Sequence, residues 1–190
     1  MIKLILGDCL EKMKNIPDNS IDLVLTDPPY NKTQCSWDSI IPFEPMWQHL
    51  KRITKPDKAI VLFGSQPFTS GLITSNLPHF KYCWAWDKIN PTGHLNAKKR
   101  PMKKLEDIVV FSYGKVPYHP QGLVWNPRTK TRNDNTEGSQ CYGKHKNTNT
   151  ATWEGYPTER LEFKNENGLH PTQKPVSLLE YLIKTYTHEE

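Results

Sequence analysis

The sequence predicts an α/β fold, namely a doubly wound, mainly parallel sheet with helices on both faces. Strand-length apolar runs alternate along the chain with helix-length amphipathic runs, as such a sheet requires. The run Ile21–Leu25, interrupted only by Asp22, is typical of a buried parallel strand. A chain of 190 residues with 36% hydrophobic content can bury one core, so we expect a single domain over residues 1–190.

The expected elements follow from local pattern and punctuation. A helix over Phe43–Ile53 is amphipathic and ends before Pro56, and one over Pro67–Ser75 opens with proline in its first turn. Leu178, Leu179, Leu182 and Ile183 stand at helical spacing after Pro175. The remaining expectations are a short helix over Cys9–Lys14, a C-terminal helix over Leu178–Thr185, and strands over Ile2–Leu6, Ile21–Leu25, Ala59–Phe63, Tyr82–Trp86 and Ile108–Ser112.

The alternation breaks down between Lys115 and Gly168. Residues 126–152 are dominated by Asn, Thr, Lys, Arg and Gly, with almost no aliphatic side chains, so they cannot supply a core of their own. We therefore divide the domain into a core (1–114), an insertion (115–168) and a C-terminal segment (169–190). An amide-rich insertion is suited to reading base edges, and an ordinary solvated loop is an equal alternative.

The segment Thr26-Asp27-Pro28-Pro29-Tyr30 follows directly after the strand Ile21–Leu25. In an open α/β sheet, ligands bind at the carboxyl ends of the strands, which is where these side chains emerge. Asp-Pro-Pro is also an ordinary turn, because each proline pushes the preceding residue out of the helical region. The position therefore indicates a site, and the composition alone does not.

These residue types suit the presentation of an amino-bearing ring to an electrophile. The exocyclic amine of adenine or cytosine is a poor nucleophile, because its lone pair is delocalised into the ring. Asp27 and the carbonyl of Pro28 can each accept one N–H of such an amine, and the proline ring holds that carbonyl in place. Tyr30 can stack on the ring, and a base inside a duplex must be flipped out to reach it.

The positive charge of the chain is local. The formal net charge is +5, and six of the 25 Lys and Arg residues lie within residues 88–104, which contain no acidic residue. Such a stretch is typical of a phosphate-contacting loop, with a solvated surface loop as the alternative. The candidate nucleic-acid contacts are Lys88, Lys98, Lys99, Arg100, Lys103 and Lys104.

Three blocks of the chain resemble the amino-group DNA methyltransferases that use S-adenosylmethionine. The catalytic signature of that family is Asp, Asn or Ser, then Pro-Pro, then an aromatic residue, here Asp27, Pro28, Pro29 and Tyr30. Gly7-Asp8-Cys9-Leu10 and His170-Pro171-Thr172-Gln173-Lys174-Pro175 resemble further family blocks, in the permuted order where the catalytic motif comes first. The resemblance implies a Rossmann-like domain, a DNA substrate and a methyl group transferred to a flipped base, most simply adenine N6, with cytosine N4 as the alternative.

The resemblance also implies the cofactor contacts. Asp8 and Cys9 would lie at the adenine of S-adenosylmethionine, and Thr172, Gln173 and Lys174 at its methionine end, where Lys174 can pair with the carboxylate. In the family a glycine-rich turn completes this pocket, but none of the ten glycines here forms a Gly-x-Gly pair. The fold is therefore expected to be incomplete at the C-terminus. A second chain supplying that loop, or an inactive DNA-binding remnant, are the alternatives to an active enzyme.

The remaining composition argues against other classes. The four cysteines lie far apart without a Cys-x-x-Cys pair, so we expect neither a metal site nor a disulfide framework. No apolar run approaches the ~20 residues of a membrane span, and the N-terminal apolar stretch is too short for a signal peptide. A cytoplasmic location is the default expectation.

Overall fold

The structure is a computed structural model, and it describes residues 2–31, 38–133, 148–166, 168 and 172–188. The chain divides into two compact units. Unit 1 comprises Met1–His119 with Thr158–Glu190, and unit 2 comprises Pro120–Pro157. Within the described residues, no helix is long and apolar enough to cross a membrane.

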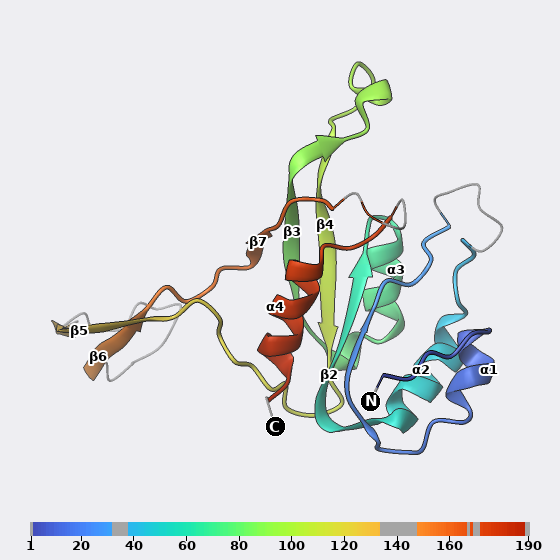
Figure 1. The fold of residues 1–190 in the computed structure, drawn as a ribbon, viewed down its shortest axis with the longest axis horizontal. Helices are drawn as coiled ribbons and strands as arrows, with labels where there is room; N and C mark the ends of the chain where they lie inside the picture. Colours follow the sequence, from blue (N-terminus) through green and yellow to red (C-terminus); the bar gives the residue numbers. More distant parts are fainter. Residues whose placement is uncertain (1, 32–37, 134–147, 167, 169–171, 189–190) are drawn as a thin grey trace. The chain divides into compact units, whose positions relative to one another are not determined.

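Unit 1 is built on a five-stranded sheet (Figure 1). Its strand order is β1-β2-β4-β3-β7. The strands are β1 (Ile21–Thr26), β2 (Thr54–Gly64), β3 (Phe80–Thr92), β4 (Lys103–Phe111) and β7 (Arg160–Glu162). The strands expected at Ile21–Leu25, Ala59–Phe63, Tyr82–Trp86 and Ile108–Ser112 are therefore present, most of them longer than expected.

The strand directions differ from the expectation of a mainly parallel sheet. β1 pairs with β2 and β3 with β7 in parallel, whereas β4 is antiparallel to both β2 and β3. The reason is the connection between β3 and β4, which is a hairpin without a crossover helix. The α/β fold is confirmed, but the sheet is mixed.

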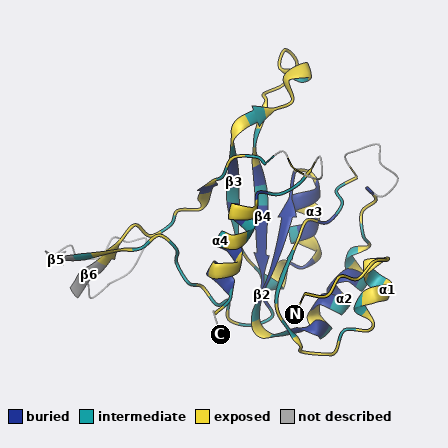
Figure 2. Cartoon of the chain, in the orientation of Figure 1, coloured by how far each residue is buried: buried dark blue, intermediate teal, exposed yellow. Residues whose placement is uncertain are grey.

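Helices cover both faces of this sheet, as expected. α2 (Phe43–Ile53) and α3 (Phe68–Ser75) pack on one face, and α4 (Val176–Tyr186) packs on the other (Figure 1). Alternate residues of β2 show the division, because Val61 and Phe63 join the α4 side while Ile60 and Leu62 join the α2 and α3 side. The central strands β2 and β4 supply most of the buried strand residues (Figure 2).

The N-terminal segment does not form the expected strand. Residues 2–6 have no regular structure, and Ile2, Leu4 and Leu6 are each more than 90% exposed. A strand needs a neighbour to satisfy its backbone hydrogen bonds, and among the described residues this segment has none. The short helix α1 (Cys9–Met13) follows, and its Leu10 and Met13 pack against the α2 side of the core.

Unit 2 is a β-hairpin where the sequence pattern indicated only an insertion. β5 (Val124–Asn133) pairs antiparallel with β6 (Thr148–Glu154). Trp125 and Trp153 face each other across the two strands, with ring centroids 5.2 Å apart. These aromatic rings supply an apolar contact between the strands, which the polar composition of residues 126–152 did not predict.

Candidate functional site

The Asp-Pro-Pro-Tyr segment lies at the carboxyl end of β1, as the sequence indicated. β1 ends at Thr26, Pro28 is buried, and the Asp27 side chain is 30% exposed. Asp38 fixes the chain after the motif, because its Oδ1 accepts hydrogen bonds of 2.9 Å from the backbone N–H groups of Tyr30 and Asn31. The motif therefore forms a turn whose position is fixed by β1 before it and by the buried Asp38 carboxylate after it.

Five side chains from four parts of unit 1 meet at this turn, and we call them the site cluster: Asp27, Tyr30, Lys88, Glu106 and Lys174. Lys174 Nζ lies 2.5 Å from Asp27 Oδ2 and 3.2 Å from Glu106 Oε1. The Tyr30 hydroxyl donates to Asp27 Oδ1 and lies 3.3 Å from Glu106 Oε1. Lys88 Nζ lies 2.6 Å from Glu106 Oε2.

The core elements set the positions of these groups. Lys88 and Glu106 belong to the adjacent strands β3 and β4, and Lys174 immediately precedes Pro175, the N-cap of α4. Leu178 and Leu182 of α4 are fully buried, which anchors the helix on the sheet. Lys174 therefore reaches Asp27, 147 residues earlier in the chain, through the packing of α4.

Aromatic rings line the cluster. Lys174 Nζ lies 5.0 Å from the centroid of the Phe63 ring, and Lys88 Nζ lies 5.0 Å from that of Trp86, both within cation–π range. The Tyr30 ring packs on Phe68 with a centroid separation of 5.0 Å. These rings hold the charged groups in a largely water-excluded setting.

Burial and pairing act together on the ionisable groups. Desolvation opposes ionisation of Glu106, but Lys174 and Lys88 outweigh it and lower the pKa of this carboxyl below its ordinary value. Burial, with the nearby Asp27 and Glu106 carboxylates, raises the pKa of Tyr30 well above its usual range. The cluster therefore contains two carboxylates, two ammonium groups and a neutral phenol.

The proposed cofactor residues fall into two places. Asp8 Oδ1 caps α1 by accepting from the backbone N–H groups of Leu10 (2.9 Å) and Glu11 (3.2 Å), and Cys9 begins that helix. Gln173 Nε2 lies 3.5 Å from Glu166 Oε2, and Thr172 precedes it. Of the five residues, only Lys174 is a member of the site cluster, and His170 and Pro171 lie outside the described residues.

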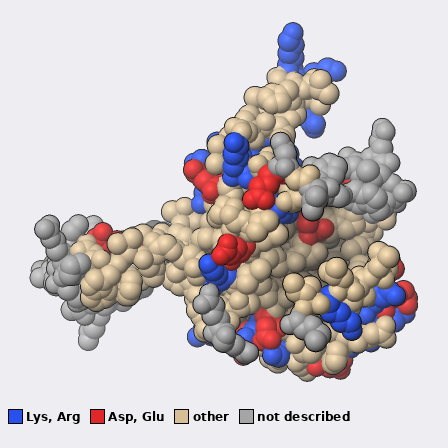
Figure 3. All heavy atoms as spheres, in the orientation of Figure 1, with Lys and Arg blue, Asp and Glu red and all other residues tan. Residues whose placement is uncertain are grey.

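The six basic residues also separate into two groups. Lys98, Lys99 and Arg100 are exposed at the end of the β3–β4 hairpin, where Lys and Arg side chains gather in the space-filling view (Figure 3). The other three make contacts within the protein. Lys88 pairs with Glu106, Lys104 Nζ lies 3.1 Å from Asp87 Oδ2, and Lys103 donates to the Ser65 hydroxyl.

The hairpin end has a defined backbone. Gly93 has φ 92°, a left-handed conformation that favours glycine, and a 3₁₀ turn over His94–Asn96 follows it. The Asn96 carbonyl accepts from the backbone N–H groups of Lys99 (2.9 Å) and Arg100 (3.0 Å). The three exposed cations are thus carried on a turn closed by its own hydrogen bonds.

Three features of the site were not predicted from the sequence, namely Glu106, Asp38 and the inward role of Lys88. Glu106 is 6% exposed although it lies in the charged first half of β4, next to Asp107, and Asp38 is also 6% exposed. This charged half-strand gives no clear signal that Glu106 is buried, although a buried carboxylate requires partners. Nothing in the sequence indicates that those partners are Lys88 and Lys174.

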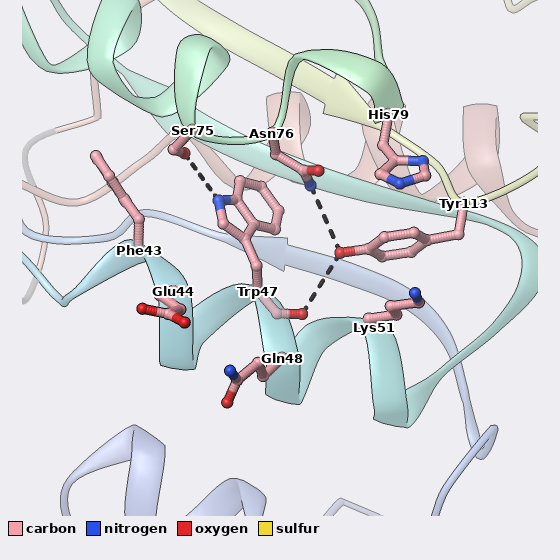
Figure 4. A pocket seen from close by; sticks show the side chains of 9 residues that line it. All are labelled: Phe43, Glu44, Trp47, Gln48, Lys51, Ser75, Asn76, His79 and Tyr113. Carbon is pink, nitrogen blue, oxygen red and sulfur yellow. Dashed lines mark hydrogen bonds between the residues drawn. The ribbon is translucent and has the colours of Figure 1, made fainter.

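A separate hollow of about 480 Å³ lies between α2 and the chain after α3 (Figure 4). Its polar groups bond mainly to one another. Trp47 Nε1 donates to Ser75 (2.8 Å) and the Tyr113 hydroxyl donates to the Trp47 carbonyl (3.4 Å). Tyr113 follows β4, whose Phe111 pairs with Ile60, whereas Thr26, next to Asp27, pairs with Leu62, so the chain at Tyr113 runs toward the amino end of β2 and away from Asp27.

The sheet, its two helical layers and the site cluster define a Rossmann-like α/β domain with a polar site at the carboxyl end of a core strand. The family model N6_N4_Mtase, described as DNA methylase, matches residues 21–190. The chain belongs to this DNA methylase family.

Two curated relatives are similar over most of the chain. Type II methyltransferase M.HpaI of Haemophilus parainfluenzae is 25% identical over 206 residues, covering 98% of this chain and 60% of the relative. Type II methyltransferase M.HinfI of Haemophilus influenzae is 28% identical over 220 residues, covering 93% of this chain and 53% of the relative. The chain therefore spans less than two thirds of the length of either relative.

Two solved structures share the fold. The M1.HpyAVI–SAM complex has a TM-score of 0.61 at 23% identity, covering 99% of this chain and 78% of that chain. The PvuII DNA methyltransferase, described as cytosine-N4-specific, has a TM-score of 0.61 at 18% identity, covering 96% and 69%. At these identities the likeness supports the fold.

Proposed function

We propose that this chain carries the catalytic site of a DNA methyltransferase that transfers a methyl group from S-adenosylmethionine to an exocyclic base amine, most simply adenine N6. The observation that carries the proposal is the site cluster at the carboxyl end of β1. In this cluster the Tyr30 hydroxyl donates to the Asp27 carboxylate next to the buried Pro28, which supports a catalytic role for these signature residues.

In the proposed reaction, S-adenosylmethionine supplies a methyl group bound to a positively charged sulfur. The amine nitrogen forms a bond to the methyl carbon, the carbon–sulfur bond breaks with its electron pair going to sulfur, and the methylated amine loses a proton. Asp27 and the Pro28 carbonyl accept the two N–H groups of the amine and stabilise the positive charge that develops on nitrogen. Tyr30 orients the base, and Pro29 keeps the turn rigid.

The position of Lys174 supports its proposed contact with the methionine carboxylate of the cofactor. An in-line transfer requires the methyl group of the cofactor to lie next to the amine that Asp27 holds. Lys174 Nζ is 2.5 Å from the Asp27 carboxylate, so it lies close to where the cofactor must bind. Thr172 and Gln173 adjoin Lys174 in sequence, whereas Asp8 and Cys9 would serve the adenine end. The described residues fit the methionine end of the cofactor better than a complete pocket, because they include no glycine-rich turn.

We propose the exposed cations of the β3–β4 hairpin as the contact with DNA phosphates. Lys98, Lys99 and Arg100 extend into solvent with no acidic residue at the hairpin end. Lys88, Lys103 and Lys104 would contribute to the positive field from their positions nearer the sheet. The substrate base would be flipped from the duplex to reach Asp27.

A methylation assay tests this proposal and identifies the target base. Genomic DNA is incubated with the protein and S-adenosylmethionine carrying a labelled methyl group, digested to nucleosides and separated by mass spectrometry. Label in deoxyadenosine supports adenine N6, whereas label in deoxycytidine assigns cytosine N4. Sequencing of the modified positions in the same DNA gives the recognition sequence.

A second candidate is a chain that binds DNA but depends on another polypeptide for its cofactor site. The side chains of Ile2, Leu4 and Leu6 favour it, since large apolar side chains this exposed are suited to being covered by another protein segment. Calorimetric titration of S-adenosylmethionine, alone and with a candidate partner chain, separates the two. Binding only with the partner supports dependence, and DNA binding without cofactor affinity under either condition supports an inactive remnant.

A further inference from the structure

Lys174 lies between two carboxylates, only one of which belongs to the catalytic signature. Its Nζ is 2.5 Å from Asp27 Oδ2 and 3.2 Å from Glu106 Oε1, and the Tyr30 hydroxyl is shared between the same two acids. The Glu106 side chain is 7% exposed and that of Lys174 is 11% exposed. Two groups that contact Asp27 therefore have a second, buried acceptor in Glu106.

Asp27 has both oxygens engaged in the structure. Oδ1 accepts from Tyr30 and Oδ2 accepts from Lys174. A target amine that donates to Asp27 must compete with these two donors. The Lys174 ammonium is the stronger competitor, because a charged ammonium donates more strongly than a neutral group. The ammonium must remain charged and partnered when the amine takes over part of Asp27, since an unpaired buried cation is costly.

The transfer itself adds to this requirement. Positive charge moves from the cofactor sulfur to the amine nitrogen, so a cation beside Asp27 repels the developing charge unless another group balances it. Glu106 lies within ion-pair distance of Lys174, on the strand β4. Its second oxygen is held by Lys88 at 2.6 Å, which fixes the carboxylate in place.

We propose that Glu106 is a positioning residue that holds Lys174 and the Tyr30 hydroxyl when a base amine engages Asp27, so that Asp27 is available to the amine and the charge of Lys174 is balanced. The inference rests on the proposed function. The lowered pKa of Glu106 agrees with it, since desolvation is outweighed by Lys174 and Lys88 and the carboxylate stays ionised at neutral pH.

The test uses Glu106→Gln, which removes the charge and keeps the shape of the side chain. Methyl transfer is measured at saturating S-adenosylmethionine on unmethylated DNA that contains the recognition sequence. We expect kcat to fall on the order of 10-fold to 100-fold, by analogy with the loss found when a residue that holds a metal ligand is replaced. The KM for DNA should change by less than about 3-fold, because Glu106 is not placed on the DNA surface. Glu180→Gln, which removes an exposed carboxylate paired with Lys184 on α4, should match the wild type.

A second substitution separates charge balance from simple disruption of the structure. Glu106→Gln with Lys174→Met removes both members of the pair, so at S-adenosylmethionine concentrations that saturate this variant in spite of the lost Lys174 contact, kcat should equal or exceed that of Glu106→Gln alone. A fall in which the two single effects multiply would overturn the inference, and so would wild-type kcat in Glu106→Gln. Urea unfolding of each variant confirms that the folded fraction is complete under assay conditions.

If Glu106→Gln alone does not fold, the comparison moves to a Lys88→Met background, where removal of the carboxylate is matched by removal of a cation. The same rescue by Lys174→Met is expected there, and its absence overturns the inference. Failure of the proposed function has a different signature. In that case the wild type transfers no methyl group to any DNA, and the inference falls with it.

Discussion

At the residue scale, the site depends on a small number of charges in a largely buried setting. Asp27 is bound by Tyr30 and Lys174, and Glu106 holds Lys174 and Lys88 from the other side. Two carboxylates and two ammonium groups balance, so the charges of the cluster sum to zero. Removal of any one of these charges therefore affects the others, and single substitutions should not act independently.

Asp27→Ala should greatly slow methyl transfer while leaving DNA affinity within a few-fold of wild type. Removing one charge-assisted hydrogen bond made in the transition state typically costs ~2–4 kcal/mol, which is about 30-fold to 1,000-fold in rate. Lys174 keeps its ion pair with Glu106 in this variant, so the fold should survive. Single-turnover methylation and fluorescence anisotropy with labelled DNA measure the two quantities, and wild-type turnover would refute the role of Asp27.

Glu106 also predicts a pH dependence of stability. Its pKa is lowered in the folded protein from an ordinary value of 4.5, because its two lysine partners outweigh desolvation. A lowered folded-state pKa means that Glu106 contributes stability above its ordinary pKa, and that the contribution is lost as pH falls through the folded value. The unfolding free energies of wild type and Glu106→Gln, measured in urea, should differ at pH 7, and the difference should shrink as the pH falls below 4.5 toward the lowered folded-state pKa. A difference that persists unchanged in acid would exclude this ionisation as its source.

At the element scale, the helices and strands with strong local signals were predictable. α2 occupies Phe43–Ile53 as expected, because its amphipathic pattern and the proline that follows fix both ends. β7 was missed because it is three residues long and pairs with residues 85–87 of β3, far away in sequence. Short strands that depend on such pairing carry little local signal.

The β3–β4 hairpin gives a prediction that concerns DNA binding. Replacing Lys98, Lys99 and Arg100 with Ala should weaken binding to all sequences and reduce the slope of log K against log salt by up to ~0.9 for each phosphate that is no longer neutralised. The matched control is Leu95→Ala, which changes a fully exposed apolar residue on the same turn without changing charge. An unchanged salt slope in the triple variant, measured by anisotropy titrations, would place the DNA elsewhere on the protein.

At the scale of the whole molecule, the fold class was predictable and the strand directions were not. Alternating apolar and amphipathic segments indicate an α/β sheet, but they do not distinguish a crossover from a long hairpin at residues 88–104. The motif that carries the site could also be found, since Asp27 follows a clear strand. The pairing of Asp27 with Lys174, and of Lys174 with Glu106, could not be predicted, because it depends on β4 lying in the same sheet as β1 and on α4 packing against that sheet.

The last prediction concerns the cofactor. Residues 1–190 contain no Gly-x-Gly pair, so the sequence does not supply the glycine-rich turn that the family resemblance implies for backbone contacts to the cofactor. If two charge-assisted hydrogen bonds are missing, affinity for S-adenosylmethionine should be ~2–3 kcal/mol weaker than that of a complete site, or about 30-fold to 150-fold. Supplying a glycine-rich strand–turn–helix segment, fused to the chain or as a separate polypeptide, should restore the affinity and shield Ile2, Leu4 and Leu6 from hydrogen exchange. Isothermal titration calorimetry measures the first effect and exchange mass spectrometry the second. Low-micromolar binding by residues 1–190 alone would show that Asp8, Lys174 and their neighbours form a sufficient pocket without that turn.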